Sequence, residues 1–272
     1  MKGWKHALVT GAASGLGLAF AIRLLRRGTS VSALDRHMPN QARQALDQAA
    51  ATGGTTWGLH IADVTDEHTV VQAVNTAATR FGSFDLTLHS AGVVLNRTLA
   101  STSTAEFRRV IDVNLLGTFH VVKAALAHMQ AGSRLALIAS MAGLTSNYGY
   151  AAYGTSKYGV VGLATTLRYE YEARGIHVSC ICPPEIRTPM VAYERRPGNS
   201  EALSLKLKDI AGSLEVDPAV DAMLSQLDRG RWLIIPGFKA KTVAAIYRFV
   251  PSLHFAVVHR IVTQALRKQV RN

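Results

Sequence analysis

Two residues four positions apart, Tyr153 and Lys157, could carry out acid–base chemistry in this sequence. On a helix, residues at this spacing share one face, so the lysine ammonium could lie near the phenol and favour its ionised form. A free tyrosine has a pKa of about 10, which is too high for an efficient base near neutral pH. Tyr153 is therefore the candidate proton shuttle, and we expect Lys157 to lower its pKa.

Two polar residues could complete this constellation. Ser140 directly follows an apolar run and could hydrogen-bond a substrate oxygen, while Asn114 could hold a water that links Lys157 to solvent. Three of these residues have plainer alternatives. Tyr153 and Lys157 could be a packed ring and a solvated charge. Asn114 could mark a helix kink or be a buried amide bonded to backbone. The combination of all four residues with the motifs below favours a proton relay.

Short apolar runs that read as strands alternate with longer helical patterns along the chain. The runs are Ala7–Val9, Val31–Leu34, Trp57–Ile61, Leu86–His89, Leu135–Ala139, Val178–Cys182 and Trp232–Ile235. This alternation predicts an α/β fold with a doubly wound parallel sheet that is covered by helices on both faces. Ligands of such sheets bind beyond the carboxyl ends of the strands. We expect one catalytic domain over residues 1–237 and a C-terminal extension over residues 238–272.

The first strand ends in a glycine-rich turn that could hold a dinucleotide. Its candidate contacts are Gly11, Ser14, Gly15, Leu16 and Gly17. The N-terminus of the following helix offers free N–H groups to a pyrophosphate. Asp35 ends the second strand, about 20 residues further on, where an acid could bind the adenosine ribose. Asp35 would repel a 2′-phosphate and so favours NAD, although Arg36 could neutralise that phosphate and leaves NADP open.

Residues after the third and fourth runs could also contact this cofactor. Asp63 and Val64 could bind the adenine, although a turn acid that opens the next helix is an equal alternative for Asp63. Ser90, Ala91 and Gly92 are small enough to let the cofactor lie against the backbone. A cationic oxidised nicotinamide would add to the expected lowering of the tyrosine pKa, and Lys157 could grip its ribose.

In this combination the residues resemble the short-chain dehydrogenase/reductase family over positions 5–237. The turn from Thr10 to Gly17 is similar to the cofactor turn of that family, and its catalytic tetrad falls on Asn114, Ser140, Tyr153 and Lys157. The resemblance implies a Rossmann-type fold and hydride transfer between NAD(H) or NADP(H) and an alcohol or carbonyl compound. It also implies a homodimer or homotetramer.

The loop after the sixth run adds cofactor contacts and one departure from the family. The resemblance implies that Pro183, Ile186 and Thr188 line the nicotinamide, with Thr188 bonding the carboxamide. Pro184 replaces the usual Gly of that loop, and Ser90 replaces the usual Asn after the fourth strand. These departures could stiffen the loop and alter how the fourth strand is braced.

The segment 182–190, the variable lid and the basic tail are loosely similar to the branch that contains 3-ketosphinganine reductases. Those enzymes generally use NADPH, which conflicts with Asp35. We therefore expect NAD and a lipophilic alcohol or ketone, with a 3-ketosphinganine-type NADPH reductase as the alternative. An alternative from another class is a cofactor-binding regulator or scaffold without turnover.

Positive charge is concentrated at the C-terminal end of the 272-residue chain, whose formal net charge is +12. Between Arg229 and Asn272 there are nine lysines and arginines and no acidic residue. Two amphipathic segments, interrupted at Pro251, fit peripheral contact with an anionic membrane surface or packing on a neighbouring subunit. The longest uncharged run, residues 249–259, falls far below the ~20 residues of a membrane span. No binding module for nucleic acid accompanies the charge.

Two further sequence features concern location and metals. The first residues lack the pattern of a secretory signal, which predicts a cytoplasmic protein, with peripheral contact at the inner membrane surface as an option. Cys180 and Cys182 lie in an apolar run without Cys or His partners at zinc-site spacing, so we expect core residues and no metal.

Overall fold

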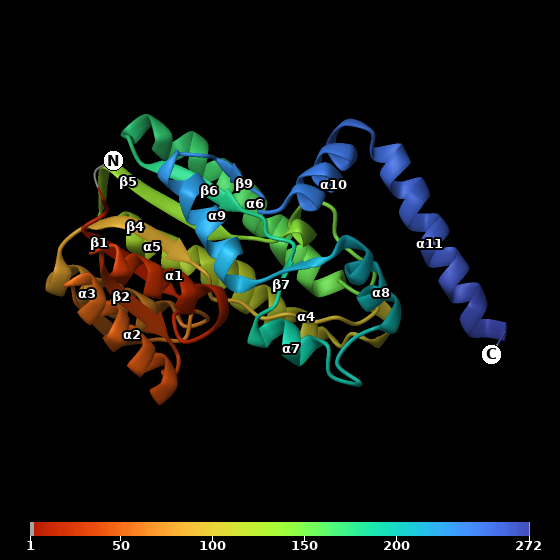
Figure 1. Ribbon diagram of the computed structural model, residues 1–272, viewed down its shortest axis with the longest axis horizontal. Coiled ribbons are helices and arrows are strands. Elements are labelled where there is room, and N and C mark those ends of the chain that lie inside the picture. Colours follow the sequence, from red (N-terminus) through yellow and green to blue (C-terminus); the bar gives the residue numbers. More distant parts are fainter. Residues whose placement is uncertain (1–2, 272) are drawn as a thin grey trace.

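In the computed structural model, which describes residues 3–271, seven parallel strands form one sheet between two layers of helices (Figure 1). The strands are β1 (His6–Thr10), β2 (Ser30–Asp35), β3 (Trp57–Ile61), β4 (Phe84–His89), β5 (Met129–Ile138), β6 (His177–Ile181) and β9 (Leu233–Ile234). Their order in the sheet is β3-β2-β1-β4-β5-β6-β9. Each predicted run contributes a strand, so the predicted doubly wound α/β fold is confirmed.

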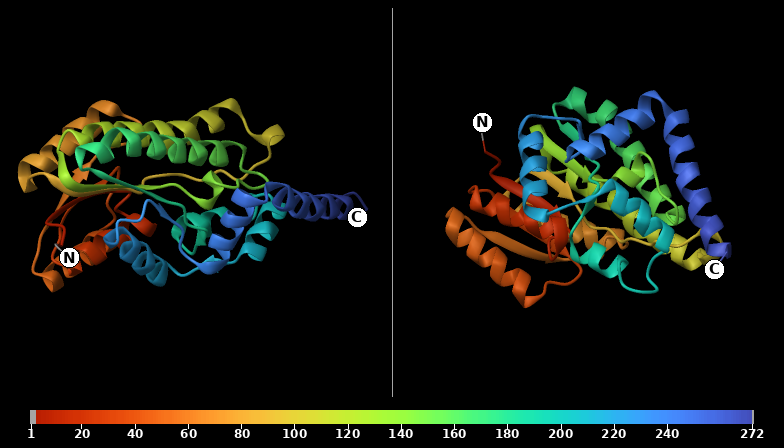
Figure 2. Two further views of the ribbon diagram at one scale, coloured as in Figure 1. Left: turned by 90° about the horizontal axis from the view of Figure 1, so that it is seen from above. Right: turned by 45° about the vertical axis from the view of Figure 1, so that its right-hand side comes forward.

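Helices that follow the strands cover both faces of the sheet, as the turned view shows (Figure 2). One face carries α1 (Gly15–Arg26), α2 (Asn40–Gly53) and α9 (Val216–Asp228). The other carries α3 (Glu67–Phe81), α5 (Gly117–Leu126) and α6 (Ala151–Tyr171). Strand β1 is buried along its whole length, as expected of a parallel sheet that is covered on both sides.

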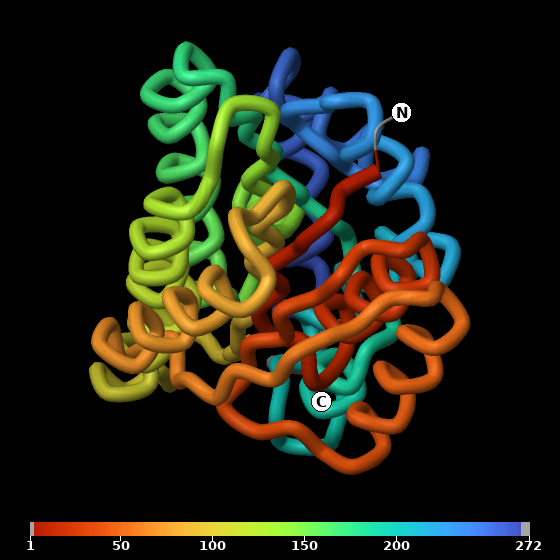
Figure 3. The backbone as a smooth tube through the Cα atoms, turned by 90° about the vertical axis from the view of Figure 1, so that its left-hand side faces the viewer, coloured from red at the N-terminus to blue at the C-terminus, as the bar shows by residue number. Residues whose placement is uncertain are grey.

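The strand order reverses beside β1, which runs into the middle of the molecule (Figure 3). From β1 the chain first builds β2 and β3 on one side and then returns to build β4, β5 and β6 on the other. Thr10 at the end of β1 pairs with His89 at the end of β4. Ligands of open α/β sheets bind at such a switch point. The topology therefore brings the predicted site residues to one edge of the sheet.

The helical pattern around Asn114 is not a regular helix. Helix α4 (Thr104–Ile111) begins with a capping box formed by Ser103 and Glu106. It continues into one π-helical turn, Asp112–Leu116, before α5 begins. Such turns often occur at functional sites because the wider turn re-aims side chains.

Beyond β6 the chain forms a lid, returns to the sheet as β9, and ends in a tail. In the lid, β7 (Glu185–Ile186) pairs with β8 (Ser213–Leu214), and α7 (Pro189–Glu194) and α8 (Ala202–Ala211) lie between them in sequence. The tail consists of α10 (Phe238–Phe249) and α11 (Pro251–Arg271), with the predicted interruption at Pro251. Helix α11 projects beyond the body of the molecule (Figure 1). Across residues 3–271, no helix has the length and apolar character needed to cross a membrane.

Candidate active site

The glycine-rich turn after β1 forms a cradle that side chains would fill. A Cβ atom on Gly17 would lie 2.2 Å from the carbonyl oxygen of Gly11, and one on Gly11 would lie 2.9 Å from the Ala91 nitrogen. Gly11 and Gly15 have φ angles of 65° and 54°, in the left-handed region that favours glycine. Ser14 gives no side-chain cap to α1 in the described chain. Backbone N–H groups at this helix start can therefore approach a pyrophosphate, so the turn fits a dinucleotide.

Asp35 lies at the end of β2 with its carboxylate turned toward this cradle. Its Oδ2 accepts a hydrogen bond from the Ala13 N–H group at 3.0 Å, and its Oδ1 accepts one from the His37 N–H group at 3.4 Å. Arg36 is exposed and lines the same cavity as Asp35. Asp35 is not the cap of α2, which begins after Pro39.

Asp63 forms a turn and also lines the cavity, together with Val64. Its Oδ1 accepts hydrogen bonds from the N–H group and the hydroxyl of Thr65, at 2.9 and 2.8 Å. These bonds, with the positive charge of Arg36, hold the pKa of Asp63 below its ordinary value. Asp66, rather than Asp63, caps α3. Asp63 therefore forms a turn at the edge of the cavity, and it does not open the next helix, as the alternative interpretation required.

The end of β4 is tied to β1 through the Thr10 hydroxyl. Thr10 Oγ1 accepts hydrogen bonds from the N–H groups of Ser90 and Ala91, at 3.1 and 3.2 Å, and lies 2.8 Å from His89 Nδ1. Burial lowers the pKa of His89 to about 3, so Nδ1 can accept the Thr10 proton. This arrangement braces the strand end that carries Ser90 in place of the usual Asn. A Cβ atom on Gly92 would lie 3.1 Å from Asn114 Oδ1.

Asn114 clamps the segment after β4 to helix α6. Its Oδ1 accepts a hydrogen bond from the Val93 N–H group at 2.8 Å, and its Nδ2 donates to the Val93 carbonyl and to Ser156 Oγ, each at 2.9 Å. The residue is 1% exposed. This geometry matches the interpretation of Asn114 as a buried amide bonded to backbone. The clamp fixes the helix that carries Tyr153 and Lys157.

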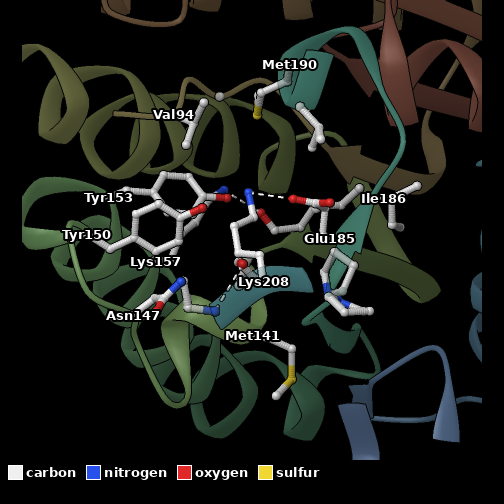
Figure 4. A pocket seen from close by; sticks show the side chains of 18 of the residues that line it. Val94, Met141, Asn147, Tyr150, Tyr153, Lys157, Glu185, Ile186, Met190 and Lys208 are labelled. Atoms are coloured by element: carbon white, nitrogen blue, oxygen red, sulfur yellow. Dashed lines mark hydrogen bonds and ion pairs between the residues drawn. The ribbon is translucent and has the colours of Figure 1, made fainter. Parts of the chain in front are cut away.

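Ser140, Tyr153 and Lys157 line one wall of the cavity, where Tyr153 and Lys157 lie together (Figure 4). Ser140 follows β5, and its Oγ accepts a hydrogen bond from the Ala142 N–H group at 3.1 Å. The Lys157 Nζ atom donates to the Ile138 carbonyl at 3.0 Å and lies 5.8 Å from the centroid of the Tyr153 ring. The structure thus brings these three predicted residues together at the carboxyl edge of the sheet.

The charge states of Tyr153 and Lys157 differ from the expectation. Burial raises the pKa of Tyr153 to about 12, the charge of Glu194 adds to the rise, and a hydrogen bond with Ser140 opposes it. Burial lowers the pKa of Lys157 to about 8. The expected lowering of the tyrosine pKa by Lys157 is therefore wrong for the protein alone. The ammonium bonds the Ile138 carbonyl instead, and burial dominates, so the phenol is protonated and can donate its proton.

The loop after β6 closes over the glycine cradle. The Pro183 carbonyl accepts a hydrogen bond from the Met141 N–H group at 2.9 Å, which ties the loop to the segment after Ser140. Ile186 is buried, and Thr188 faces the cradle, since a Cβ atom on Gly15 would lie 3.6 Å from the Thr188 Cβ. Pro183, Ile186 and Thr188 all line the cavity, as expected of residues beside a nicotinamide.

A buried ionic network beside Tyr153 has no counterpart in the sequence prediction. Glu194 is 2% exposed, and its Oε1 accepts hydrogen bonds from the Tyr150 hydroxyl at 2.7 Å and from Asn96 Nδ2 at 2.8 Å. Lys208 Nζ lies 2.6 Å from Glu194 Oε2 and 2.7 Å from Glu185 Oε2. These residues are spread from position 96 to position 208 and form no motif, so no pattern in the sequence signals the network.

A single cavity of about 1060 Å³ connects these parts. Its inner wall contains the glycine cradle, Asp35 and the three residues Ser140, Tyr153 and Lys157. Its outer wall comes from the lid and the tail, with the apolar side chains of Met190, Leu207, Val243, Ile246, Leu253 and Val257. The charged groups of Glu194, Lys208 and Lys239 also line it, so apolar side chains are combined with a few polar groups, as in pockets for small organic ligands.

Comparisons with known proteins agree with this arrangement. The family model described as short chain dehydrogenase matches residues 5–198. The 3-dehydrosphinganine reductase TSC10B of Arabidopsis thaliana is 32% identical over 236 residues, covering 85% of this chain and 69% of that protein. The 3-hydroxyacyl-CoA dehydrogenase type-2 of Homo sapiens is 37% identical over 199 residues, covering 68% and 74%. The structure of levodione reductase matches with a TM-score of 0.75 at 28% identity, covering 85% and 95%.

The chain therefore belongs to the short-chain dehydrogenase family, whose members are oxidoreductases that act on CH–OH groups with a nicotinamide cofactor. Within that family its relatives include 3-dehydrosphinganine reductases, which confirms the loose similarity to that branch.

Proposed function

We propose that this protein transfers a hydride between NAD(H) and a lipophilic alcohol or ketone, with Tyr153 as the acid/base. The observation that carries this proposal is the meeting of Ser140, Tyr153 and Lys157 with a glycine cradle in one cavity. The cofactor, when bound, supplies or accepts the hydride. In the reductive direction the Tyr153 phenol gives its proton to the carbonyl oxygen, and the Ser140 hydroxyl hydrogen-bonds that oxygen. Oxidation reverses these transfers.

Two further residues of the proposed relay act on the cofactor and on the catalytic helix. Lys157 binds the nicotinamide ribose and keeps its charge near the phenol, from a position fixed by the Ile138 carbonyl. Asn114 holds the helix that carries both groups through its contacts with Val93 and Ser156. Because all four residues of the relay are present in one site, the non-catalytic alternative has no observation in its favour.

In this proposal the described cavity residues divide the cofactor between them. The glycine cradle would hold the pyrophosphate, Asp35 would hold the adenosine ribose, and Asp63 with Val64 would hold the adenine. Ser90, Ala91, Gly92, Pro183, Ile186 and Thr188 would hold the nicotinamide end. The fixed carboxylate of Asp35 supports NAD, because a negative charge there repels a 2′-phosphate. Arg36 keeps NADP, and with it a 3-ketosphinganine-type reductase, as the alternative.

The proposed lipophilic substrate is supported by the outer wall of the cavity. Side chains of α8, α10 and α11 contribute apolar groups to this wall, among them Leu207, Ile246 and Leu253. A relative named 3-dehydrosphinganine reductase is consistent with a substrate that carries a long hydrocarbon chain. A polar substrate would leave this wall without a favourable partner.

We also propose that the tail contacts an anionic membrane surface. Phe238 and Phe249 are 84% and 77% exposed, and Leu253, Phe255 and Val257 are exposed beside them. The same helices also carry basic residues, among them Arg248 in α10 and Arg260 and Arg267 in α11. Exposed aromatic and aliphatic side chains with basic neighbours suit the boundary of an anionic bilayer.

Exposed Leu116 and Phe119 on the body support a separate proposal, a homodimer or homotetramer.

A substrate panel tests the proposed function. The purified protein is given NADH or NADPH with methyl ketones whose alkyl chain grows from butyl to dodecyl, and cofactor oxidation is followed by absorbance. We expect NADH-dependent turnover whose kcat/KM rises with chain length, because each added methylene gains apolar contact in the outer cavity. A Ser140→Ala variant is the control for contaminating activity. Equal rates for short and long chains would contradict the lipophilic substrate, and absence of turnover with every ketone would contradict the activity.

A further inference from the structure

Glu194 makes an indirect connection between the lid and the proposed acid/base. It is the last residue of α7, and its Oε1 accepts a hydrogen bond from the Tyr150 hydroxyl at 2.7 Å. Tyr150 stands at the start of α6, and its ring lies edge-on to the Tyr153 ring with the centroids 4.9 Å apart. Both tyrosines belong to the same wall of the cavity (Figure 4). A displacement of Glu194 would therefore be transmitted to Tyr153 through one ring contact.

The Glu194 carboxylate is buried, and each of its oxygens has a partner. Lys208 Nζ, from α8, lies 2.6 Å from Oε2, and Asn96 Nδ2 donates to Oε1 at 2.8 Å. A buried charge persists only when it is paired and hydrogen-bonded in this way. Burial and the charge of Glu194 both favour the protonated Tyr150, which can then only donate to the carboxylate.

We propose that Glu194 is a positioning residue for the proton donor: it fixes Tyr150 against Tyr153 and supplies a negative charge that favours the protonated phenol. The consequence is a site suited to giving a proton to a carbonyl oxygen over a wide pH range. This inference rests on the proposed role of Tyr153 and adds the lid residue that tunes it.

The other charged and titratable groups around Tyr153 come from several elements. Lys157 lies on its own helix, Cys182 follows β6, and Glu185 and Lys208 come from β7 and α8. His89 faces Lys157 from β4, and burial lowers its pKa to about 3, so it is neutral near pH 7. Glu185 shares Lys208 with Glu194 but also pairs with Arg195, at 2.7 Å. Glu194 is the carboxylate among them that raises the pKa of Tyr153.

The test compares Glu194→Gln with Glu185→Gln as a matched control. Both variants remove one carboxylate charge from the same network, and only the first removes the charge that bears on Tyr153. The ionisation of Tyr153 is followed by tyrosinate absorbance, as the difference between each protein and its Tyr153→Phe counterpart. We expect Glu194→Gln to lower the midpoint by roughly half a pH unit or more, because ionising the phenol no longer opposes a nearby like charge. Glu185→Gln should leave the midpoint unchanged.

The same shift is expected in catalysis of reduction. With NADH and decyl methyl ketone, kcat/KM should fall in two steps at alkaline pH, first as Lys157 and then as Tyr153 loses its proton, and in Glu194→Gln the second step should begin at lower pH. Glu194→Asp retains the charge and should restore the wild-type profile. If Glu194→Gln does not fold, as judged by circular dichroism, Tyr150→Phe tests the positioning contact, since it keeps the ring and removes the hydroxyl that donates to Glu194. We expect kcat/KM to fall in Tyr150→Phe, and a wild-type value would overturn the positioning role.

The two proposals fail in different ways. A wild-type midpoint in Glu194→Gln, or an equal shift in Glu185→Gln, overturns the role of Glu194 and leaves the acid/base role of Tyr153 intact. Full turnover of the ketone by Tyr153→Phe overturns that acid/base role, while the difference titration still reports whether Glu194 acts on the phenol.

Discussion

The carboxylate of Asp35 is oriented before a ligand arrives, because the Ala13 N–H group holds its Oδ2 at 3.0 Å. The same bond connects the end of β2 to the glycine cradle. A ribose that enters the cradle would therefore meet a fixed acceptor, and a 2′-phosphate would meet a fixed negative charge. In the proposed preference for NAD, the charge of Asp35 opposes NADPH, and Arg36 is the nearby charge that would favour it.

Asp35→Asn separates that charge from the shape of the site. The asparagine Oδ1 can still accept from Ala13, so the cradle is kept while the repulsion is removed. We expect the ratio of the NADPH to the NADH dissociation constant to fall by roughly tenfold, which corresponds to about 1.4 kcal/mol. Fluorescence titration of both cofactors measures the ratio, with Asp63→Asn as a control for removal of charge at the adenine end. An unchanged ratio in Asp35→Asn would refute the assignment.

At this scale the sequence predicted which residues meet but not the pKa shift of Tyr153. Ser140, Tyr153 and Lys157 could be selected from the sequence because strand ends and helical spacing fix which residues meet. The direction in which the pKa of Tyr153 shifts could not be predicted from the sequence. It depends on burial, on Glu194 and on the Ile138 carbonyl that binds Lys157. Those contacts arise only in the folded chain.

At the scale of elements, the π-helical turn around Asn114 joins two parts of the site. The turn lets the Asn114 amide satisfy both backbone groups of Val93, which lies just beyond β4. Regular helical spacing carries no requirement for such a turn. The sequence signal for the π-helical turn is a polar residue, Asn114, inside an apolar helical pattern. This signal does not specify Val93 as the partner of Asn114.

Asn114→Ala should lower stability because it leaves the partly buried Val93 N–H and carbonyl groups without their Asn114 partner. We expect a loss of about 2 kcal/mol or more in the free energy of unfolding, measured by urea denaturation. Asn75→Ala, at an exposed position on α3, is the control and should cost less than about 1 kcal/mol. Equal stabilities for Asn114→Ala and the wild type would show that the clamp contributes nothing.

Strand positions were predictable because buried parallel strands are nearly continuous apolar runs. Their ends were less so. Strand β5 begins at Met129, six residues before the predicted run from Leu135, because its first half is largely exposed. The predicted run Trp232–Ile235 forms a strand of only 2 residues at the edge of the sheet. Residues 130–132 are exposed and lack the apolar signal by which strands are recognised, whereas residues 232–235 carry that signal although only two of them pair with β6.

At the scale of the whole molecule, charge and hydrocarbon are separated along the chain. The basic tail is readable from composition, since no acidic residue follows Asp228. The tail also lines the outer cavity, through α10 and α11. This contact could not be predicted from composition, because it joins segments distant in sequence. The proposed membrane surface and the outer wall of the cavity therefore share the helices α10 and α11.

Flotation with phosphatidylserine-containing vesicles tests the tail. We expect wild-type protein to float with these vesicles, to float less with pure phosphatidylcholine, and to be released as salt rises, because screening weakens the attraction. The double variant Phe249→Glu with Phe255→Glu should lose flotation. Tyr169→Glu, at a position 79% exposed on α6, should float like the wild type. Equal flotation of all three proteins would contradict a membrane surface on the tail and favour packing on a neighbouring subunit.

The most direct test of the central claim is the kcat/KM of Tyr153→Phe with NADH and decyl methyl ketone, measured beside its dissociation constant for NADH. The substitution keeps the ring and removes the proton that the proposed relay transfers. If Tyr153 is the acid/base, we expect a loss of roughly 10²- to 10⁴-fold in kcat/KM with NADH binding largely retained. Turnover equal to that of the wild type would contradict Tyr153 as the acid/base.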